Sequence, residues 1–163
     1  MTVATGCGGD DDGATADVGA LVPSKRDYIV QADTVCQQAE QAIETEIEVR
    51  LGIGADDFRM LPSGRVVFKP GREPAPAQIE RFGTEVVLPT LREQLADLRA
   101  LTPPRDDEQA TAEVYDRAER GIDRLASDTA LFSDRAAVRR ALTEARRLGR
   151  RYGFYDCGTY SGP

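Results

Sequence analysis

The residues that could carry chemistry in this chain are three cysteines, many acids and many arginines, with no histidine among its 163 residues. Without an imidazole there is no histidine general base, no Ser-His-Asp triad and no histidine ligand for a metal ion. A cysteine nucleophile would also lack the histidine that usually activates it. We therefore expect the cysteines to serve as attachment or cross-linking points, and we expect a protein that is not an enzyme.

Cys7 lies among small residues, in the segment VATGCGG of residues 3–9. A small residue directly before a cysteine, here Gly6, resembles the end of a bacterial lipoprotein signal peptide, in which the cysteine is lipidated after cleavage. The resemblance implies a lipid on Cys7 and a translation start upstream, because no apolar export segment of about 7 to 15 residues precedes it. Residues 1–23 are then a lipobox-like start and a solvated tether. The alternative is a polar tail that contains a cysteine.

If Cys7 carries lipid, Cys36 and Cys157 remain as a pair that one disulfide can join. Closing a loop of this length contributes on the order of 5 kcal/mol in the chain-entropy model, which is comparable to the stability of a small domain. Disulfides persist in oxidising compartments, so this pairing agrees with export from the cytoplasm. Two unrelated buried thiols are the alternative.

Acidic residues outnumber basic ones by 28 to 21, which gives a formal net charge of -7. This balance argues against a general nucleic-acid-binding domain, which is normally basic. The acidic runs at residues 10–12 and 56–57 lack the ligand spacing and the glycine of a calcium-binding loop. We expect neither a bound metal nor a cofactor.

Positive charge is concentrated near the carboxyl end of the chain. Residues 133–152 hold seven arginines and two acids, whereas residues 106–128 hold eight acids and three arginines. Arg139, Arg146 and Arg150 lie opposite the apolar side of the expected helix and form a candidate surface for an anionic envelope component or a partner protein. The alternative is a solvated face that pairs with acids of the preceding helix. Those acids are Glu113, Asp116, Glu119 and Asp123.

Apolar residues recur at spacings of three and four through most of the chain, which is the pattern of amphipathic helices. The predicted helices begin at Ser24, near Pro76, at Asp106 and at Ser133. Pro89 lies inside the second helix and removes a hydrogen bond there, so we expect a kink or a break near residue 88. Short connections favour antiparallel neighbours, and we expect an all-α, up-and-down bundle of about four helices closed by one disulfide.

Residues 52–74 depart from the helical pattern and are rich in Gly and Pro. Two short β-prone runs flank the turn signal Pro62-Ser63-Gly64, so a small β-hairpin is expected over residues 58–68. Such a hairpin needs support from the helices to persist. Because loops on rigid scaffolds often carry function, this segment is a second candidate binding element, with a structural cover as the alternative.

Three further motifs accompany the Cys7 segment: ADTVC at residues 32–36, VLP at residues 87–89 and YGFYDCG at residues 152–158. Together the four motifs resemble small predicted lipoproteins of actinobacteria, a family without an established activity. The resemblance covers most of the chain. It implies an envelope location, a helical fold and a disulfide, and it carries over no catalytic residue.

The sequence thus favours a helical domain over residues 24–163 that is exported and either held at the outer face of the cell membrane by lipid on Cys7 or secreted. We expect a non-enzymatic module that binds an envelope component or has a structural role. One alternative is a carrier of small hydrophobic molecules with an apolar pocket between its helices. Another is an enzyme that uses carboxylates alone, which would require two acids facing each other across a cleft.

Overall fold

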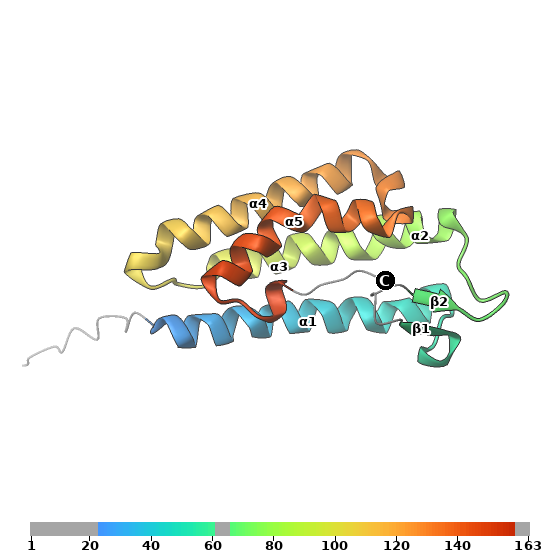
Figure 1. The fold of residues 1–163 in the computed structure, drawn as a ribbon, viewed down its shortest axis with the longest axis horizontal. Coiled ribbons are helices and arrows are strands. Elements are labelled where there is room, and N and C mark those ends of the chain that lie inside the picture. Colours follow the sequence, from blue (N-terminus) through green and yellow to red (C-terminus); the bar gives the residue numbers. More distant parts are fainter. Residues whose placement is uncertain (1–22, 61–65, 159–163) are drawn as a thin grey trace, which may run out of the picture.

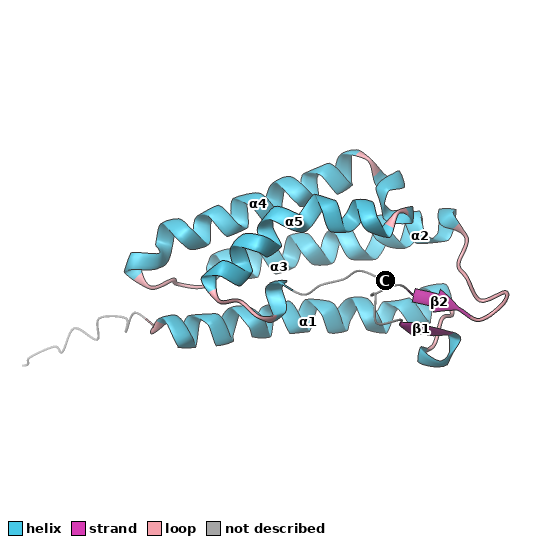
Figure 2. Cartoon of the chain, viewed as in Figure 1, coloured by secondary structure: helices cyan, strands magenta, loops and turns pink. Residues whose placement is uncertain are grey.

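Within residues 23–60 and 66–158, which the computed structural model describes, four helical segments alternate in direction (Figure 1). The segments are α1 (Lys25–Leu51), the joined helices α2 (Pro76–Phe82) and α3 (Leu88–Ala100), α4 (Glu108–Ser127) and α5 (Arg135–Tyr152). Helix dominates the described chain, as Figure 2 shows. The predicted all-α, up-and-down bundle is confirmed. Cys7 lies outside the described residues.

Both ends of α1 follow from local side-chain chemistry. The Ser24 hydroxyl accepts a hydrogen bond from the backbone N–H of Asp27 at 3.2 Å, which satisfies a donor that the first helical turn leaves unpaired. At the other end, Gly52 has a φ of 62°, and its N–H donates to the Glu48 carbonyl at 3.1 Å. A residue without a Cβ adopts this left-handed conformation at little cost, so α1 ends there.

The second helical segment passes Pro89 without breaking. A π-helical turn, Gly83–Val87, joins α2 to α3, and the Leu88 N–H bonds to the Gly83 carbonyl five residues back. The wider turn lets the helix continue although proline has no N–H to donate, so the irregularity predicted near residue 88 is a π-helical turn rather than a break. Gly83 also packs directly on the Phe132 ring, because a Cβ at this position would lie 2.1 Å from the ring atom Cγ.

The helices α4 and α5 begin two residues after their predicted starts. Short 3-10 turns, Arg105–Asp107 and Thr129–Ser133, occupy the preceding positions. Asp134 caps α5, since its carboxylate accepts the backbone N–H of Ala136 at 2.8 Å. The two helices pack closely, and a Cβ on Gly121 of α4 would lie 2.5 Å from the Ala141 carbonyl oxygen of α5.

The predicted hairpin is confirmed. Strands β1 (Phe58–Met60) and β2 (Val66–Phe68) pair antiparallel with Phe58 opposite Phe68, and the predicted turn at residues 62–64 lies outside the described residues. A salt bridge supports the base of the hairpin, where Arg72 approaches the Asp57 carboxylate at 2.7 Å. The same guanidinium donates to the Gly52 carbonyl, which connects the hairpin to the end of α1.

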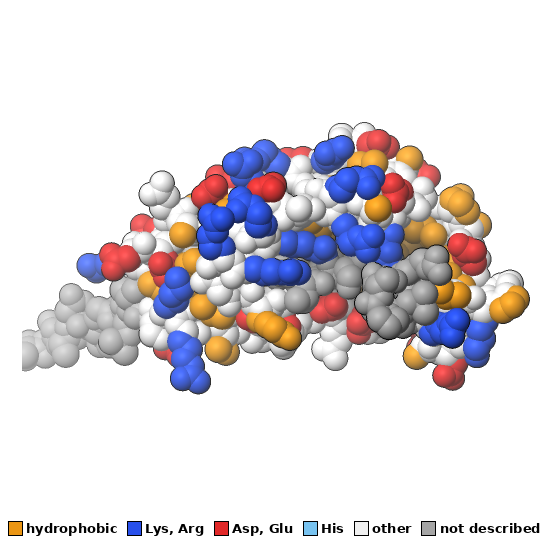
Figure 3. All heavy atoms as spheres, in the orientation of Figure 1, with side chains coloured by type: hydrophobic (Ala, Val, Ile, Leu, Met, Phe, Trp, Pro, Cys, Tyr) orange, Lys and Arg blue, Asp and Glu red, His pale blue; other side chains and the backbone are white. Residues whose placement is uncertain are grey.

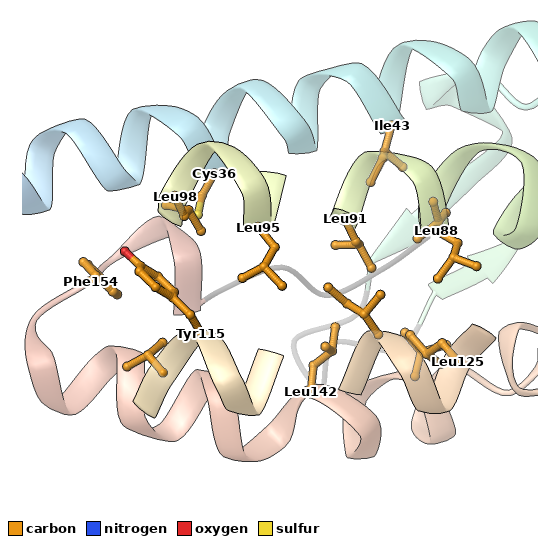
Figure 4. Close-up of a cluster of buried hydrophobic side chains, with 14 of the residues drawn as sticks. Cys36, Ile43, Leu88, Leu91, Leu95, Leu98, Tyr115, Leu125, Leu142 and Phe154 are labelled. Carbon is orange, nitrogen blue, oxygen red and sulfur yellow. The ribbon is translucent and has the colours of Figure 1, made fainter. Parts of the chain in front are cut away.

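The core lies between the helical segments and draws on all of them. Figure 4 shows buried apolar side chains from each, including Ile43 of α1, Leu95 of α3, Leu125 of α4 and Leu142 of α5. Burial of such side chains provides the main favourable free energy of folding. In the described ranges, no helix has both the length and the apolar composition needed to cross a bilayer.

Candidate functional site

The described part of the molecule contains a groove between α1 and α5. Helix α1 packs against α3, α3 against α4, and α4 against α5. Within the described residues, α1 and α5 contact each other much less than these neighbouring pairs do. The space between them contains a cavity of about 80 Å³ that is open to solvent. We call this feature the α1–α5 groove.

The lining of the α1–α5 groove is mostly apolar. Its floor consists of Leu91, Leu95, Leu98, Tyr115 and Ile122, from α3 and α4. Its walls are Cys36, Ala39 and Ile43 of α1 and Leu142, Ala145 and Gly149 of α5. Leu95 and Leu142 point into the interior from opposite sides, as Figure 4 shows.

Small residues on the walls create the space. Ala39 and Ala145 face the groove from α1 and α5, at positions where a longer side chain would fill it. Gly149 lies further along α5, and a Cβ there would meet Phe154 at an ordinary contact distance of 3.4 Å. The groove therefore depends both on the separation of α1 from α5 and on the small side chains of its walls, so we expect a larger side chain at Ala39 to narrow it.

The Cys36–Cys157 disulfide lies in the wall of the groove. It joins residues 121 positions apart in the sequence, with their Cα atoms 5.1 Å from each other, and it confirms the predicted pairing. Cys157 belongs to a short 3-10 turn, Asp156–Gly158, which we call the closing turn. The disulfide fixes the closing turn beside α1, so that Asp156 and Cys157 line the groove.

Asp33 holds the closing turn from the α1 side. The residue is 9% exposed, and its carboxylate accepts hydrogen bonds from the backbone N–H groups of Tyr155 at 3.0 Å, Asp156 at 3.0 Å and Cys157 at 3.3 Å. A buried carboxylate requires such partners, and hydrogen bonds to a charged acceptor are the stronger kind. No role was predicted for Asp33 from the sequence. Its position one helical turn before Cys36 was the available signal.

Charged side chains of opposite sign meet at the rim of the groove. Glu40 of α1 and Arg146 of α5 both line it and are half-buried. Burial raises the pKa of Glu40, as do the negative charges of Glu44 and Asp156, whereas the positive charge of Arg146 opposes this shift. Asp156 in turn accepts a hydrogen bond from the Gln37 amide at 2.6 Å.

The three arginines of the predicted anionic-partner surface differ in their surroundings. Arg139 and Arg150 are exposed on α5, whereas Arg146 lines the groove. Figure 3 shows Lys and Arg side chains gathered over α5 on this face of the molecule. The structure thus places one of the three predicted residues in the groove wall and two beside it.

Several arginines and acids of α3, α4 and α5 form salt bridges with one another or with the cap residue Asp134. Arg140 and Arg147 pair within α5, with Asp134 at 3.1 Å and Glu144 at 3.0 Å. Two acids of α4 that were considered as partners for α5, Asp116 and Glu119, instead pair with Arg99 of α3. For these two acids the predicted pairing with α5 is therefore wrong.

A buried tyrosine cluster lies at the end of the bundle where α1 begins. The hydroxyls of Tyr28 and Tyr115 hydrogen-bond to each other, and burial is the main cause that raises the pKa of each. Tyr152 donates to the Asp107 carboxylate at 2.9 Å, and its ring lies 4.9 Å from that of Phe154, between centroids. The raised pKa values favour the protonated form of these hydroxyls, and the aromatic rings pack together at this end of the bundle. Tyr155 is 75% exposed.

Residues 23–60 and 66–158 contain no group of three or more Cys, Asp and Glu side chains arranged to hold a metal ion. Comparison of the chain with protein-family models, with curated proteins and with solved structures gives no match.

Proposed function

We propose that this protein is a non-enzymatic binding module that holds the apolar chain of a small molecule in the α1–α5 groove. The observation that carries the proposal is an apolar floor left open on one side of the bundle, with small residues on its walls and a few charged groups at its rim. Ligand sites in proteins commonly combine a mainly apolar lining with a small number of placed polar groups.

The size of the cavity limits the kind of ligand. At about 80 Å³ it has roughly half the volume of an engineered cavity of about 150 Å³ that binds benzene. An alkyl chain is narrower than a ring and can enter through the open side of the groove while the rest of the molecule stays outside. The ligand we propose is therefore a chain with a polar head rather than a compact ring system.

The proposed location is the outer face of the cell membrane. The disulfide supports an oxidising compartment, because thiols in the cytoplasm are normally kept reduced. Lipid on Cys7, as proposed from its sequence context, would keep the domain near a source of chain-bearing molecules. The family suggested by the sequence motifs has the same location.

Thermal unfolding with a soluble probe tests the groove. Octylphosphocholine, kept monomeric, is added to the oxidised protein and to two variants with the same substitution in α1. Ala39→Leu fills the groove, whereas Ala42→Leu places the same side chain on an exposed position one turn away. At a probe concentration about 100 times its Kd, the proposal predicts a stabilisation of about 2.7 kcal/mol for the wild type and Ala42→Leu.

The proposal also predicts that Ala39→Leu loses most of this stabilisation while it remains folded. Equal stabilisation of all three proteins would place the probe elsewhere. No stabilisation of any of them would remove the groove as a site for chains of this kind.

A second candidate function rests on the charge of α5. Residues 135–152 contain seven arginines and one acid. Such a helix is attracted to a membrane that carries anionic lipids, and the attraction weakens as salt is added. Reversal of the two exposed charges in Arg139→Glu and Arg150→Glu should release the protein from anionic vesicles at low salt. Retention equal to that of the wild type would exclude this candidate.

A further inference from the structure

The two helices on either side of the groove carry net charges of opposite sign. Helix α5 has seven arginines and one acid over residues 135–152, whereas α1 has six acids and three basic residues over residues 25–51. The closing turn adds Asp156 at the rim. A molecule whose chain lies in the groove must place its head group between these two walls.

The charged residues that line the cavity are Asp156 of the closing turn and, on the two helices, Glu40 and Arg146. The charge of Arg146 acts on Glu40 across the rim. Glu44 and Asp156 also act on Glu40, so the α1 side of the rim is acidic beyond a single residue. Arg139 and Arg150 extend the positive side along α5.

Neither a purely anionic nor a purely cationic head group suits this rim. An anionic head would meet the acids of α1 and the closing turn, and a cationic head would meet the arginines of α5. Like charges placed opposite each other weaken an interface and exclude wrong partners. A head group with separate positive and negative ends has a partner of opposite sign on each wall.

We propose that the groove selects a single-chain phospholipid with a zwitterionic head, its phosphate directed to Arg146 and its ammonium group directed to Glu40. This inference rests on the proposed function, since it assumes that the alkyl chain occupies the groove. The partial burial of both side chains strengthens their interaction with the head group, because water screens the charges less there.

Four probes with one octyl chain and different heads separate the head-group inference from the chain-binding proposal. They are octylphosphocholine, octyl phosphate, octyltrimethylammonium and octyl glucoside, each kept monomeric at pH 7. Affinity is measured by titration calorimetry on the full oxidised chain. The inference predicts that octylphosphocholine binds about tenfold more tightly than each of the other three.

Two neutralising variants then change the preference in opposite directions. Arg146→Gln leaves an acidic rim, so the cationic probe should gain affinity and the zwitterionic probe should lose it. Glu40→Gln should favour the anionic probe instead. Arg147→Gln and Glu48→Gln are the matched controls, because each makes the same change at an exposed position on the same helix, and both should keep the wild-type order.

The outcomes are distinct. If all four probes bind equally, or octyl phosphate binds best, the head-group inference is overturned while chain binding in the groove stands. If none of the four binds, both proposals fail together. The predicted order combined with opposite shifts in the two neutralising variants supports the zwitterionic head.

Discussion

The carboxylate of Asp33 accepts the backbone N–H of Asp156 at 3.0 Å, and so joins positions 123 residues apart. The neighbouring N–H groups of Tyr155 and Cys157 bond to the same carboxylate, and the Cys36–Cys157 disulfide lies one helical turn away. The closing turn is thus held to α1 twice, once by hydrogen bonds to a charge and once covalently. This double attachment keeps Asp156 and Cys157 in the lining of the groove.

Removal of the Asp33 carboxylate should destabilise the whole domain. In Asp33→Ala, backbone N–H groups of the closing turn lose a buried, charged acceptor, so we expect the free energy of unfolding to fall by about 2–3 kcal/mol. Urea denaturation of the oxidised protein measures this change. Asp97→Ala, an exposed acid of α3, is the control and should change stability little. An equal effect of the two substitutions would contradict the role assigned to Asp33.

Loss of the disulfide should weaken the fold without abolishing it. The double variant Cys36→Ala, Cys157→Ala removes a cross-link between residues 121 positions apart, and we expect a loss of about 2–5 kcal/mol in the free energy of unfolding. Asp33 still binds the closing turn, so the variant should retain its helical circular dichroism. Intact mass of the wild-type protein before and after reduction verifies that the bond is present in the sample. Unchanged stability of the double variant would show that the bond does not constrain the chain.

The hairpin end should respond to acid through Asp57. Hydrogen bonds from Arg72 and from the Gly54 N–H lower the pKa of Asp57 to about 2 from its ordinary value of 3.8. Because the folded-state pKa is the lower one, the stabilisation is fully present above the ordinary value. It is lost as the pH falls from 3.8 toward 2.

NMR titration of the Asp57 carboxyl carbon measures this pKa directly. The wild-type midpoint should lie near 2, and Arg72→Gln should move it up toward the ordinary value because the main cause of the shift is removed. Arg59→Gln, in the exposed part of β1, is the control and should leave the midpoint in place. A midpoint near 3.8 in the wild type would mean that the Asp57–Arg72 pair does not form in solution.

Local signals in the sequence predicted most of the fold. The cap at Ser24 and the glycine at position 52 fix α1 through contacts within one helical turn, and the 3-4 spacing of apolar residues marks the other helices. The hairpin follows from a turn signal between two β-prone runs. The Cys36–Cys157 pair followed from counting cysteines, once Cys7 was assigned a separate role.

The groove could not be predicted in the same way, because it depends on which helices meet. In the sequence, Ala39 and Ala145 look like ordinary apolar positions of their helices. They line a groove only because α1 and α5 lie apart in the folded bundle. The pairing of Arg99 with Glu119 likewise depends on which face of α3 turns toward α4. The π-helical turn before Pro89 could not be predicted either. The proline indicates that the helix is irregular there, but not that the backbone forms a π-helical turn.

The central claim is that an alkyl chain lies in the α1–α5 groove, and intermolecular nuclear Overhauser effects test it most directly. Octylphosphocholine is added to protein labelled at the leucine and valine methyl groups. The account predicts contacts from the octyl chain to Leu95 and Leu142, which line the groove, and none to Leu125, which is buried outside it. Contacts confined to exposed valines such as Val30 and Val49, or the absence of any contact, would contradict it.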